Sequence, residues 1–225
     1  MDVTFGDNCL TRNEWICGKY YSTRSAELQS ALVQHVGTVL ASVLLGLLIA
    51  VPLALLARRY RRLEGIVVGL TTAVYTIPSL ALFSLLVPVT GFGLRTVVIG
   101  LGLYSLTILV RAILDGLRAV PDEVRESAQG MGYGAGRLLW KVEVPLALPA
   151  FMAGLRVATV STVALTTVGS ILDYGGLGDL ILQDSTFKAQ VLAGSVLCVI
   201  LAVALDLVLV LTQRLLTPWA RKARA

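Results

Sequence analysis

The stretch VGTVLASVLLGLLIAVPLALLA, residues 36–57, contains no charged side chain. A helix needs about 20 predominantly apolar residues to cross the hydrocarbon core of a bilayer, so this stretch predicts a transmembrane helix. The whole chain of 225 residues has the same character: 56% are hydrophobic, 15% are charged, and the mean hydropathy is +0.80. Soluble domains carry about 25% charged residues, and disordered chains combine low hydrophobicity with high charge. The composition therefore predicts one polytopic membrane domain.

Four further apolar runs have the length of a membrane span: residues 65–87, 96–114, 150–172 and 191–212. The charged side chains in them are Arg111, Arg156 and Asp206. Pro52 and Pro78 lie in the first two runs, where we expect them to kink the helices rather than end them. Neighbouring helices can satisfy the backbone groups that a proline frees. We therefore predict an all-α bundle of about five transmembrane helices within residues 29–218.

Lysine and arginine are concentrated on alternate connections between the runs. Of the 19 basic residues, 14 lie between the first and second runs, between the third and fourth, after the fifth, or at the adjoining helix ends. By the positive-inside rule these segments are cytoplasmic, so the N-terminus is expected outside and the C-terminus inside the cell membrane. Membrane topology thereby explains the net charge of +5, and we expect lipid rather than nucleic acid as a partner.

Two polar tails flank the predicted membrane domain. The N-terminal tail, residues 1–28, contains Cys9 and Cys17, which would lie on the side where a disulfide can persist. Their spacing leaves pairing open, and no set of cysteines and histidines has the spacing of a metal site. The single histidine, His35, is interpreted as an interfacial helix residue. The C-terminal tail, residues 219–225, is basic.

The connection between the third and fourth runs reads DGLRAVPDEVRESAQGMGYGAGRLLWKVEVPLALP, residues 115–149. Long connections in compact proteins are often functional. Pro121 with Asp122 after it is typical of a helix start, because proline fits the first turn and an acidic side chain favours the positive helix end. We predict two short amphipathic helices, DEVRESAQ and GRLLWKVEV, separated by a glycine-rich elbow. The second is expected to stop near Pro145 and Pro149.

This connection resembles the EAA loop of the permease subunits of ATP-binding-cassette (ABC) importers. The family pattern is Glu-Ala-Ala, three residues, glycine, nine residues, and then Ile-x-Leu-Pro. The matching residues are Glu126, Ser127, Ala128, Gly132, Val142, Val144 and Pro145. Ser127, Val142 and Val144 depart from the pattern by small or conservative steps. The resemblance implies that a short helix of this loop docks in a groove of a separate ATPase subunit.

Further stretches resemble the permeases of glycine betaine/carnitine/choline importers. They are TIPSLAL at 76–82, PLALPAFMAGLR at 145–156 and GGLGD at 175–179, within a similarity over roughly residues 30–218. The resemblance implies a type I importer permease fold and ATP-driven uptake of a compatible solute such as glycine betaine or choline. It implies three partners: an ABC ATPase that binds ATP and Mg, a second permease copy or paralogue, and an extracytoplasmic binding protein. The chain itself would bind no cofactor and catalyse no reaction.

Several residues are candidates for the transport path or its gate: Tyr75, Pro78, Tyr104, Gly175, Gly176 and Asp179. A quaternary ammonium group binds well over aromatic faces, although aromatic side chains in membrane helices more often serve in packing. The GGLGD stretch is either a plain turn or part of a gate or binding-protein contact. Asp206 is an ionisable group inside a span, either paired with Arg111 or Arg156, or part of the path.

Other functions remain open at this point. The same type of permease could carry another small solute, such as an amino acid. A stand-alone secondary transporter or channel would need several intramembrane acids or a filter motif, and only Asp206 qualifies. A membrane enzyme would need paired carboxylates or a Ser/His arrangement, and the spans contain neither. The glycine-rich GMGYGAGR lacks the G-x-x-x-x-G-K-[ST] spacing, so no nucleotide is expected to bind this chain.

Overall fold

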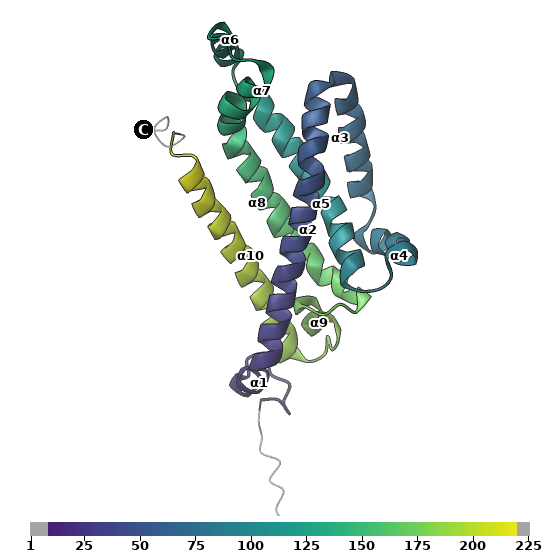
Figure 1. The fold of residues 1–225 in the computed structure, drawn as a ribbon. Helices are drawn as coiled ribbons and strands as arrows, with labels where there is room; N and C mark the ends of the chain where they lie inside the picture. Colours follow the sequence, from purple (N-terminus) through teal and green to yellow (C-terminus); the bar gives the residue numbers. More distant parts are fainter. Residues whose placement is uncertain (1–8, 220–225) are drawn as a thin grey trace, which may run out of the picture.

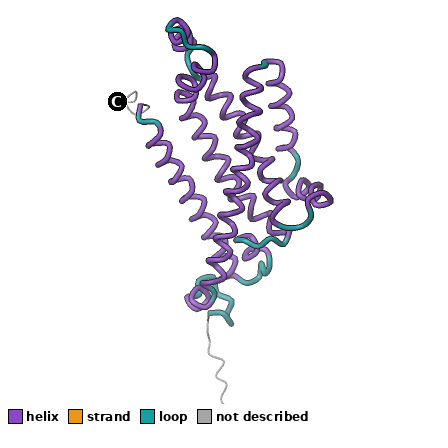
Figure 2. The backbone as a smooth tube through the Cα atoms, viewed as in Figure 1, coloured by secondary structure: helices purple, strands orange, loops and turns teal. Residues whose placement is uncertain are grey.

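The structure is a computed structural model that describes residues 9–219, and helices account for most of them (Figure 1, Figure 2). The elements are α1 (Gly18–Thr23), α2 (Ser25–Arg59), α3 (Arg61–Thr76), α4 (Ser79–Thr90), α5 (Leu94–Arg118), α6 (Asp122–Gly130), α7 (Ala135–Leu138), the π-helical turn η1 (Leu139–Glu143), α8 (Val144–Gly169), the 3-10 turn η2 (Ser170–Leu172), α9 (Leu177–Leu182) and α10 (Lys188–Leu216). The described residues form no strand.

Four helical segments are long and apolar enough to cross a membrane: Ser25–Arg59, Leu94–Arg118, Ala135–Leu172 and Lys188–Leu216. The pair α3 and α4 passes the same test together, but the two helices bend by 99° at the break between them. Counted as one span, this broken pair brings the number to five. The predicted all-α membrane bundle of about five spans is confirmed.

The expectation that Pro78 kinks its helix without ending it is wrong. α3 ends at Thr76, Ile77 has φ −69° and ψ 128°, and α4 begins only after Pro78. A proline disfavours the α conformation of the residue before it, so Ile77 leaves the helix for extended backbone. Pro52, in contrast, lies inside α2, and that helix continues through it as expected.

The prediction that the second short helix of the 115–149 connection stops near Pro145 and Pro149 is also wrong. α7 passes into η1 and then into α8, which continues to Gly169 with Pro145 in its first turn and Pro149 inside it. Within η1 the hydrogen bonds span five residues, as in the bond from the Val144 N–H to the Leu139 carbonyl. Such a π turn shifts the hydrogen-bond ladder locally, which lets the helix continue past a residue without a donor.

α5 is the centre of the bundle and makes its most extensive contacts with α2 and α8. The largest shared core combines small residues of α2 with larger ones of α5. Its buried members are Ala50, Ala54, Ala57, Leu106, Leu109, Val110, Leu114 and Ala158. Small side chains let two helix backbones approach closely, and dispersion contacts then replace contacts with lipid. α10 packs at the edge, mainly against α8 and α9.

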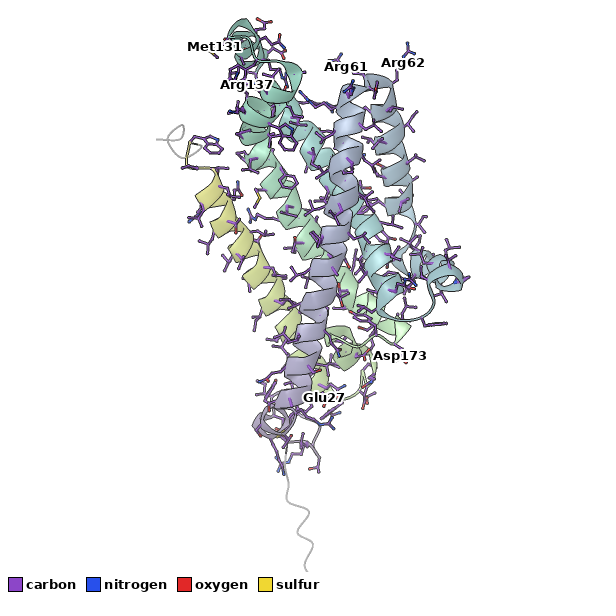
Figure 3. All side chains as sticks on the ribbon, viewed as in Figure 1. Glu27, Arg61, Arg62, Met131, Arg137 and Asp173 are labelled. Atoms are coloured by element: carbon purple, nitrogen blue, oxygen red, sulfur yellow. A yellow bond between two sulfur atoms is a disulfide. The ribbon has the colours of Figure 1, made fainter. Side chains whose placement is uncertain are left out.

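The two ends of the bundle differ in charge (Figure 3). Arg61, Arg62, Met131 and Arg137 lie at one end, where the α2–α3 turn and α6 are found, and we call it the basic end. Glu27 and Asp173 lie at the opposite end. The basic connections inferred from the sequence therefore share one end of the molecule. Residues 220–225 of the predicted basic tail, and residues 1–8, lie outside the described residues.

The described part of the predicted N-terminal tail is folded against the opposite end. Cys9 and Cys17 form a disulfide, which answers the pairing that the sequence left open. Tyr20 of α1 is buried and packs edge-to-face on Phe187, with ring centroids 5.4 Å apart. The Asn13 side chain accepts a hydrogen bond from the Lys188 N–H at 2.9 Å. The tail is thereby fastened to the start of α10, and α2 already begins at Ser25.

The α2–α5 crossing gives a direct test of this packing. A Cβ added at Gly46 would collide with Ser105 Oγ and lie 3.2 Å from the Gly102 carbonyl oxygen. Gly46→Val should therefore lower the free energy of unfolding by about 1–3 kcal/mol, as overpacking does. The measurement is thermal unfolding of the detergent-purified protein. Gly37→Val is the matched control on the same helix, because nothing lies within 4 Å of Gly37. Equal melting temperatures for the two variants would contradict the close crossing.

Candidate functional site

The loop that matches the EAA pattern forms the outermost part of the basic end (Figure 1). Glu126 and Ser127 of α6 are exposed, whereas Ala128 is buried at 2% exposure. Gly132 follows with φ +82°, a conformation that L side chains rarely adopt. Gly132 is exposed and has no neighbouring atom where a Cβ would stand. α6 thus fixes Ala128 inward and presents Glu126, Ser127 and the Gly132 turn outward.

The second half of the pattern lies below α6, at the root of the loop. Val142 belongs to η1, Val144 and Pro145 begin α8, and all three are half-buried. The exposed half of the pattern and the anchored half are therefore separate in space. Because η1 continues into α8 without a break, a push on the loop acts directly on the axis of a membrane span.

A buried carboxylate that sequence reasoning missed holds this loop in place. Glu143 is 1% exposed, although acidic side chains are almost never fully buried unless paired. Its Oε1 accepts a hydrogen bond from Arg125 Nε of α6 at 3.0 Å, and its Oε2 forms an ion pair with Arg58 at the end of α2. Arg125 Nη2 also donates to the Leu117 carbonyl of α5 at 2.6 Å. This Glu143 cluster, comprising Glu143, Arg58 and Arg125, joins α2, α5, α6 and η1.

The chemistry of Arg125 explains how the cluster tolerates its burial. Burial by itself disfavours the charged guanidinium, but hydrogen bonds to Asp122 and Glu143 outweigh it and raise the pKa of Arg125. Arg125 Nη1 donates to Asp122 Oδ1 at 2.6 Å, so three acceptors share one side chain. A single glutamate in the apolar stretch KVEVPLALP was the sequence signal for this cluster. Its partners are distant in sequence and could not be named from it.

The predicted path residues Tyr75, Pro78 and Tyr104 meet at the break between α3 and α4. The Tyr104 hydroxyl donates to the Ile77 carbonyl, which the broken helix leaves without a helical donor. The Tyr75 and Tyr104 rings pack edge-to-face with centroids 5.7 Å apart. Tyr104 is buried at 6% exposure, whereas Tyr75 is 45% exposed. The break is therefore sealed on the α5 side and open on the Tyr75 side.

The other three predicted path residues lie between η2 and α9 and in α9 itself, at the end of the bundle opposite the basic end (Figure 1). Gly175 and Gly176 have φ +90° and φ +88°, and the Gly176 N–H donates to Gln34 Oε1 of α2 at 3.0 Å. A Cβ at Gly176 would be 3.5 Å from His35 Nδ1. Asp179 of α9 is half-buried, and burial followed by the charge of Asp173 raises its pKa. The GGLGD stretch is thus bound to α2 by a hydrogen bond and is not part of the Tyr75–Tyr104 pair.

Asp206 pairs with Arg156, one of the two partners predicted from the sequence. Arg156 Nε donates to Asp206 Oδ1 at 2.7 Å, and Arg156 Nη2 donates to Oδ2 at 2.8 Å. This bidentate pair links α8 with α10. Arg111, the other predicted candidate, instead donates to Thr72 Oγ1 of α3 at 3.0 Å. His35 is fully buried with Nε2 3.1 Å from the Val163 carbonyl oxygen.

No group of three or more metal-ligating side chains comes together among residues 9–219. The glycines of the GMGYGAGR stretch lie at the end of α6, in the turn between α6 and α7, and in α7 itself. The arrangement consists of spanning helices, a broken span, and a loop that is anchored at the basic end. These features define a multi-pass membrane permease.

Comparison with known proteins specifies the family. The family model described as "Binding-protein-dependent transport system inner membrane component" matches residues 42–222. The chain belongs to this family and is the transmembrane permease subunit of an ABC importer. The glycine betaine/carnitine/choline transport system permease protein OpuCD of Bacillus subtilis (strain 168) is 36% identical over 208 residues, covering 91% of each chain.

Other similar proteins agree with this assignment. The osmoprotectant import permease protein OsmW of Salmonella typhimurium is 34% identical over 206 residues, which cover 88% of this chain and 96% of OsmW. A solved structure of the MetNI methionine ABC transporter in inward-facing conformations matches with a TM-score of 0.76. It covers 87% of this chain and 98% of the matched chain at 20% identity, so it supports the fold alone.

The Glu143 cluster predicts how firmly α6 is held. Glu143→Gln removes the charge that two arginines share, so amide hydrogen exchange in α6 should become about tenfold faster, the equivalent of one lost charge-assisted hydrogen bond. Exchange mass spectrometry of the purified protein measures this directly. Glu123→Gln is the control, because Glu123 is an exposed acid on the same helix. Unchanged exchange in the Glu143 variant would mean that apolar contacts alone hold the loop.

The Arg156–Asp206 pair predicts a compensating double substitution. Asp206→Leu leaves a guanidinium uncompensated in the membrane and should cost on the order of 2–3 kcal/mol of stability. Adding Arg156→Leu should restore most of that stability, because both charges are then gone. Melting temperatures in detergent for the two single variants and the double variant form the test. A double variant as unstable as Asp206→Leu would contradict a mainly structural pair.

Proposed function

We propose that this chain is the membrane subunit of an ATP-driven importer of a small quaternary ammonium solute, such as glycine betaine or choline. The coupling mechanism is supported by the exposed part of the loop, which comprises Glu126, Ser127 and Gly132 and which we call the α6 knob. The Glu143 cluster fixes the base of this knob. The solute class is that of the similar proteins, which are permeases for glycine betaine, carnitine and choline.

The knob is proposed to dock in a groove of a separate ABC ATPase. Glu126 offers a carboxylate to backbone or basic groups of that partner, and the open space around Gly132 allows close approach. ATP and Mg would bind the ATPase, and this chain would perform no hydrolysis itself. When ATP binding draws two ATPase subunits together, the knob moves, and η1 passes that movement into α8.

The basic end is proposed to face the cytoplasm. Fourteen of the 19 lysines and arginines lie on connections or helix ends of one side in the sequence-based topology. The N-terminal segment with the Cys9–Cys17 disulfide would then lie outside, where disulfides persist. A solute-loaded binding protein would deliver its solute at that opposite end.

A second permease copy or paralogue is proposed to complete the path. The exposed side of the α3–α4 break, with Tyr75 and Pro78, would face that second subunit. GGLGD, with Gly175, Gly176 and Asp179, would contribute to the outer gate or to the binding-protein contact. Asp206 is already bound by Arg156, which removes the feature that favoured a stand-alone transporter.

The test reconstitutes the permease with its ATPase and binding protein in proteoliposomes, and measures uptake of glycine betaine and choline. Gly132→Leu places a side chain at φ +82°, and Glu126→Lys reverses the docking charge. Each should abolish ATPase co-purification and reduce uptake at least about tenfold, the equivalent of one lost charged contact in the docking surface.

Glu14→Lys is the control for docking, because it makes the same charge reversal at an exposed side chain near the N-terminus. It should retain the ATPase. Melting temperatures of all three variants show whether the bundle remains folded. Normal uptake in both loop variants would remove the α6 knob from the mechanism. Uptake of neither solute by the wild-type complex would contradict the solute assignment.

A further inference from the structure

Arg111 is an exposed cation inside a membrane span. It lies on α5, seven residues before the end of that helix at Arg118, and its guanidinium donates to Thr72 Oγ1 of α3 at 3.0 Å. Within residues 9–219 no carboxylate lies within 4.0 Å of it, although Arg156 has Asp206 and Arg118 has Glu64 and Asp115. Arg111 thus lies inside a spanning helix without a carboxylate partner in the described part of the chain.

The surface around Arg111 is hollowed, and both charged and apolar residues line the hollow. A hollow of about 490 Å³ between α3 and α5 is lined by Arg111, Thr72, Gly65 and Gly69, and towards the basic end by Glu64, Asp115 and Arg118. Nothing lies within 4 Å of the space where a Cβ at Gly65 or Gly69 would stand. A guanidinium facing lipid is costly, so charged groups at this depth face water-filled cavities or other protein. Water in the hollow between α3 and α5 would solvate this guanidinium.

An aromatic ring stands one helical turn from the place where Arg111 contacts α3. Thr72 and Tyr75 are three residues apart on α3, so their side chains share one face at a spacing of about 5–6 Å. Tyr75 is half-exposed, and its edge-to-face contact with Tyr104 fixes its ring at the end of α3. The carbonyl end of a helix carries a partial negative charge that attracts cations. Tyr75 and the end of α3 thus offer an aromatic face and carbonyl dipoles to a cation.

We infer that Arg111 and Tyr75 form a subsite for a zwitterion, in which Arg111 binds a carboxylate and Tyr75 binds the quaternary ammonium group. This inference rests on the proposed function, because it specifies the solute class that passes the α3–α5 face. A guanidinium recognises a carboxylate through charge-assisted hydrogen bonds, and an aromatic face recognises a quaternary ammonium. The subsite therefore favours a carboxylate-bearing solute such as glycine betaine over choline, which lacks the carboxylate and would meet an uncompensated cation.

The first experiment tests water access and ligand protection at this face. Thr76 is exposed beside Tyr75, and Cys198 is the free cysteine of the described residues. Thr76→Cys in a Cys198→Ala background is treated with a membrane-impermeant maleimide in the purified permease–ATPase complex. We expect labelling in the absence of solute, and slower labelling with glycine betaine than with choline. Val203→Cys on α10 is the control, because its exposed side chain lies on the peripheral helix and should stay unlabelled. No labelling of Thr76→Cys would overturn the aqueous face and the subsite with it.

The second experiment separates the two solutes by uptake in proteoliposomes containing the full complex. Arg111→Gln should reduce glycine betaine uptake at subsaturating solute about tenfold, the equivalent of one charge-assisted contact, while choline uptake changes less than about twofold. Tyr75→Leu should reduce uptake of both solutes, and Tyr75→Phe should retain it because the ring remains. Arg95→Gln is the control, since Arg95 is an exposed arginine at the other end of the same helix.

The outcomes distinguish this inference from the proposed function. In the first outcome the wild-type complex takes up glycine betaine, and Arg111→Gln lowers glycine betaine and choline uptake equally while ATPase activity stays normal. The subsite is then wrong, and the importer assignment stands. If the wild-type complex takes up no quaternary ammonium solute, the solute assignment fails and the subsite fails with it. Loss of glycine betaine uptake with retained choline uptake supports the subsite, because a general folding defect would affect both.

Discussion

A charge within this bundle must find its partner inside the protein, because the hydrocarbon core of a membrane offers none. Asp206 and Arg156 satisfy each other and thereby join α8 to α10. Glu143 is satisfied by Arg58 and Arg125, and the same contacts set the position of α6 on the bundle. Arg111 instead donates to Thr72 and lines an open hollow between α3 and α5. Whether a charged side chain is paired with an opposite charge thus separates the structural interior from the proposed path.

The loop and the span beneath it form one continuous helical body. α7, η1 and α8 follow one another without a break, and the π turn carries the chain past Pro145. A flexible joint at this point would absorb the movement of a docked partner. The Glu143 cluster also ties the loop to α2 and α5, so in the proposed mechanism a movement of the loop would reach three spans together. The rigid root of the loop supports the proposed coupling role of α6.

Much of the fold could be predicted from apolar run length alone. The runs at 36–57, 96–114, 150–172 and 191–212 all lie within spanning helices, because their apolarity leaves few alternatives in a membrane. The effect of each proline on its helix was harder to predict, because it depends on the groups that surround the proline. Ile77, the residue before Pro78, has extended backbone, and the Tyr104 hydroxyl donates to its free carbonyl. Pro145, in contrast, is accommodated by the π turn that precedes it. Neither compensation can be read from local sequence.

The candidate site could be predicted only where a pattern lies close together in sequence. The register of Glu126, Gly132 and Pro145 identified the loop, but its anchor depends on Arg58, which is 85 residues from Glu143 in the chain. The grouping of Tyr75 with Tyr104 likewise requires α3 to lie along α5. The pairing of Cys9 with Cys17 stayed open because spacing alone does not establish that two thiols meet. Long-range contacts, rather than residue types, were the missing information.

The broken helix pair has a consequence for how the chain is made. α3 has 16 residues and α4 has 12, so each is shorter than the roughly 20 residues that a translocon recognises as a span. Two side chains bind carbonyl oxygens of this pair: Thr107 donates to the Thr71 carbonyl at 2.6 Å, and Tyr104 donates to the Ile77 carbonyl at the break. Both donors belong to α5, which leaves the ribosome later. The final positions of α3 and α4 therefore depend on contacts with a helix that is synthesised after them.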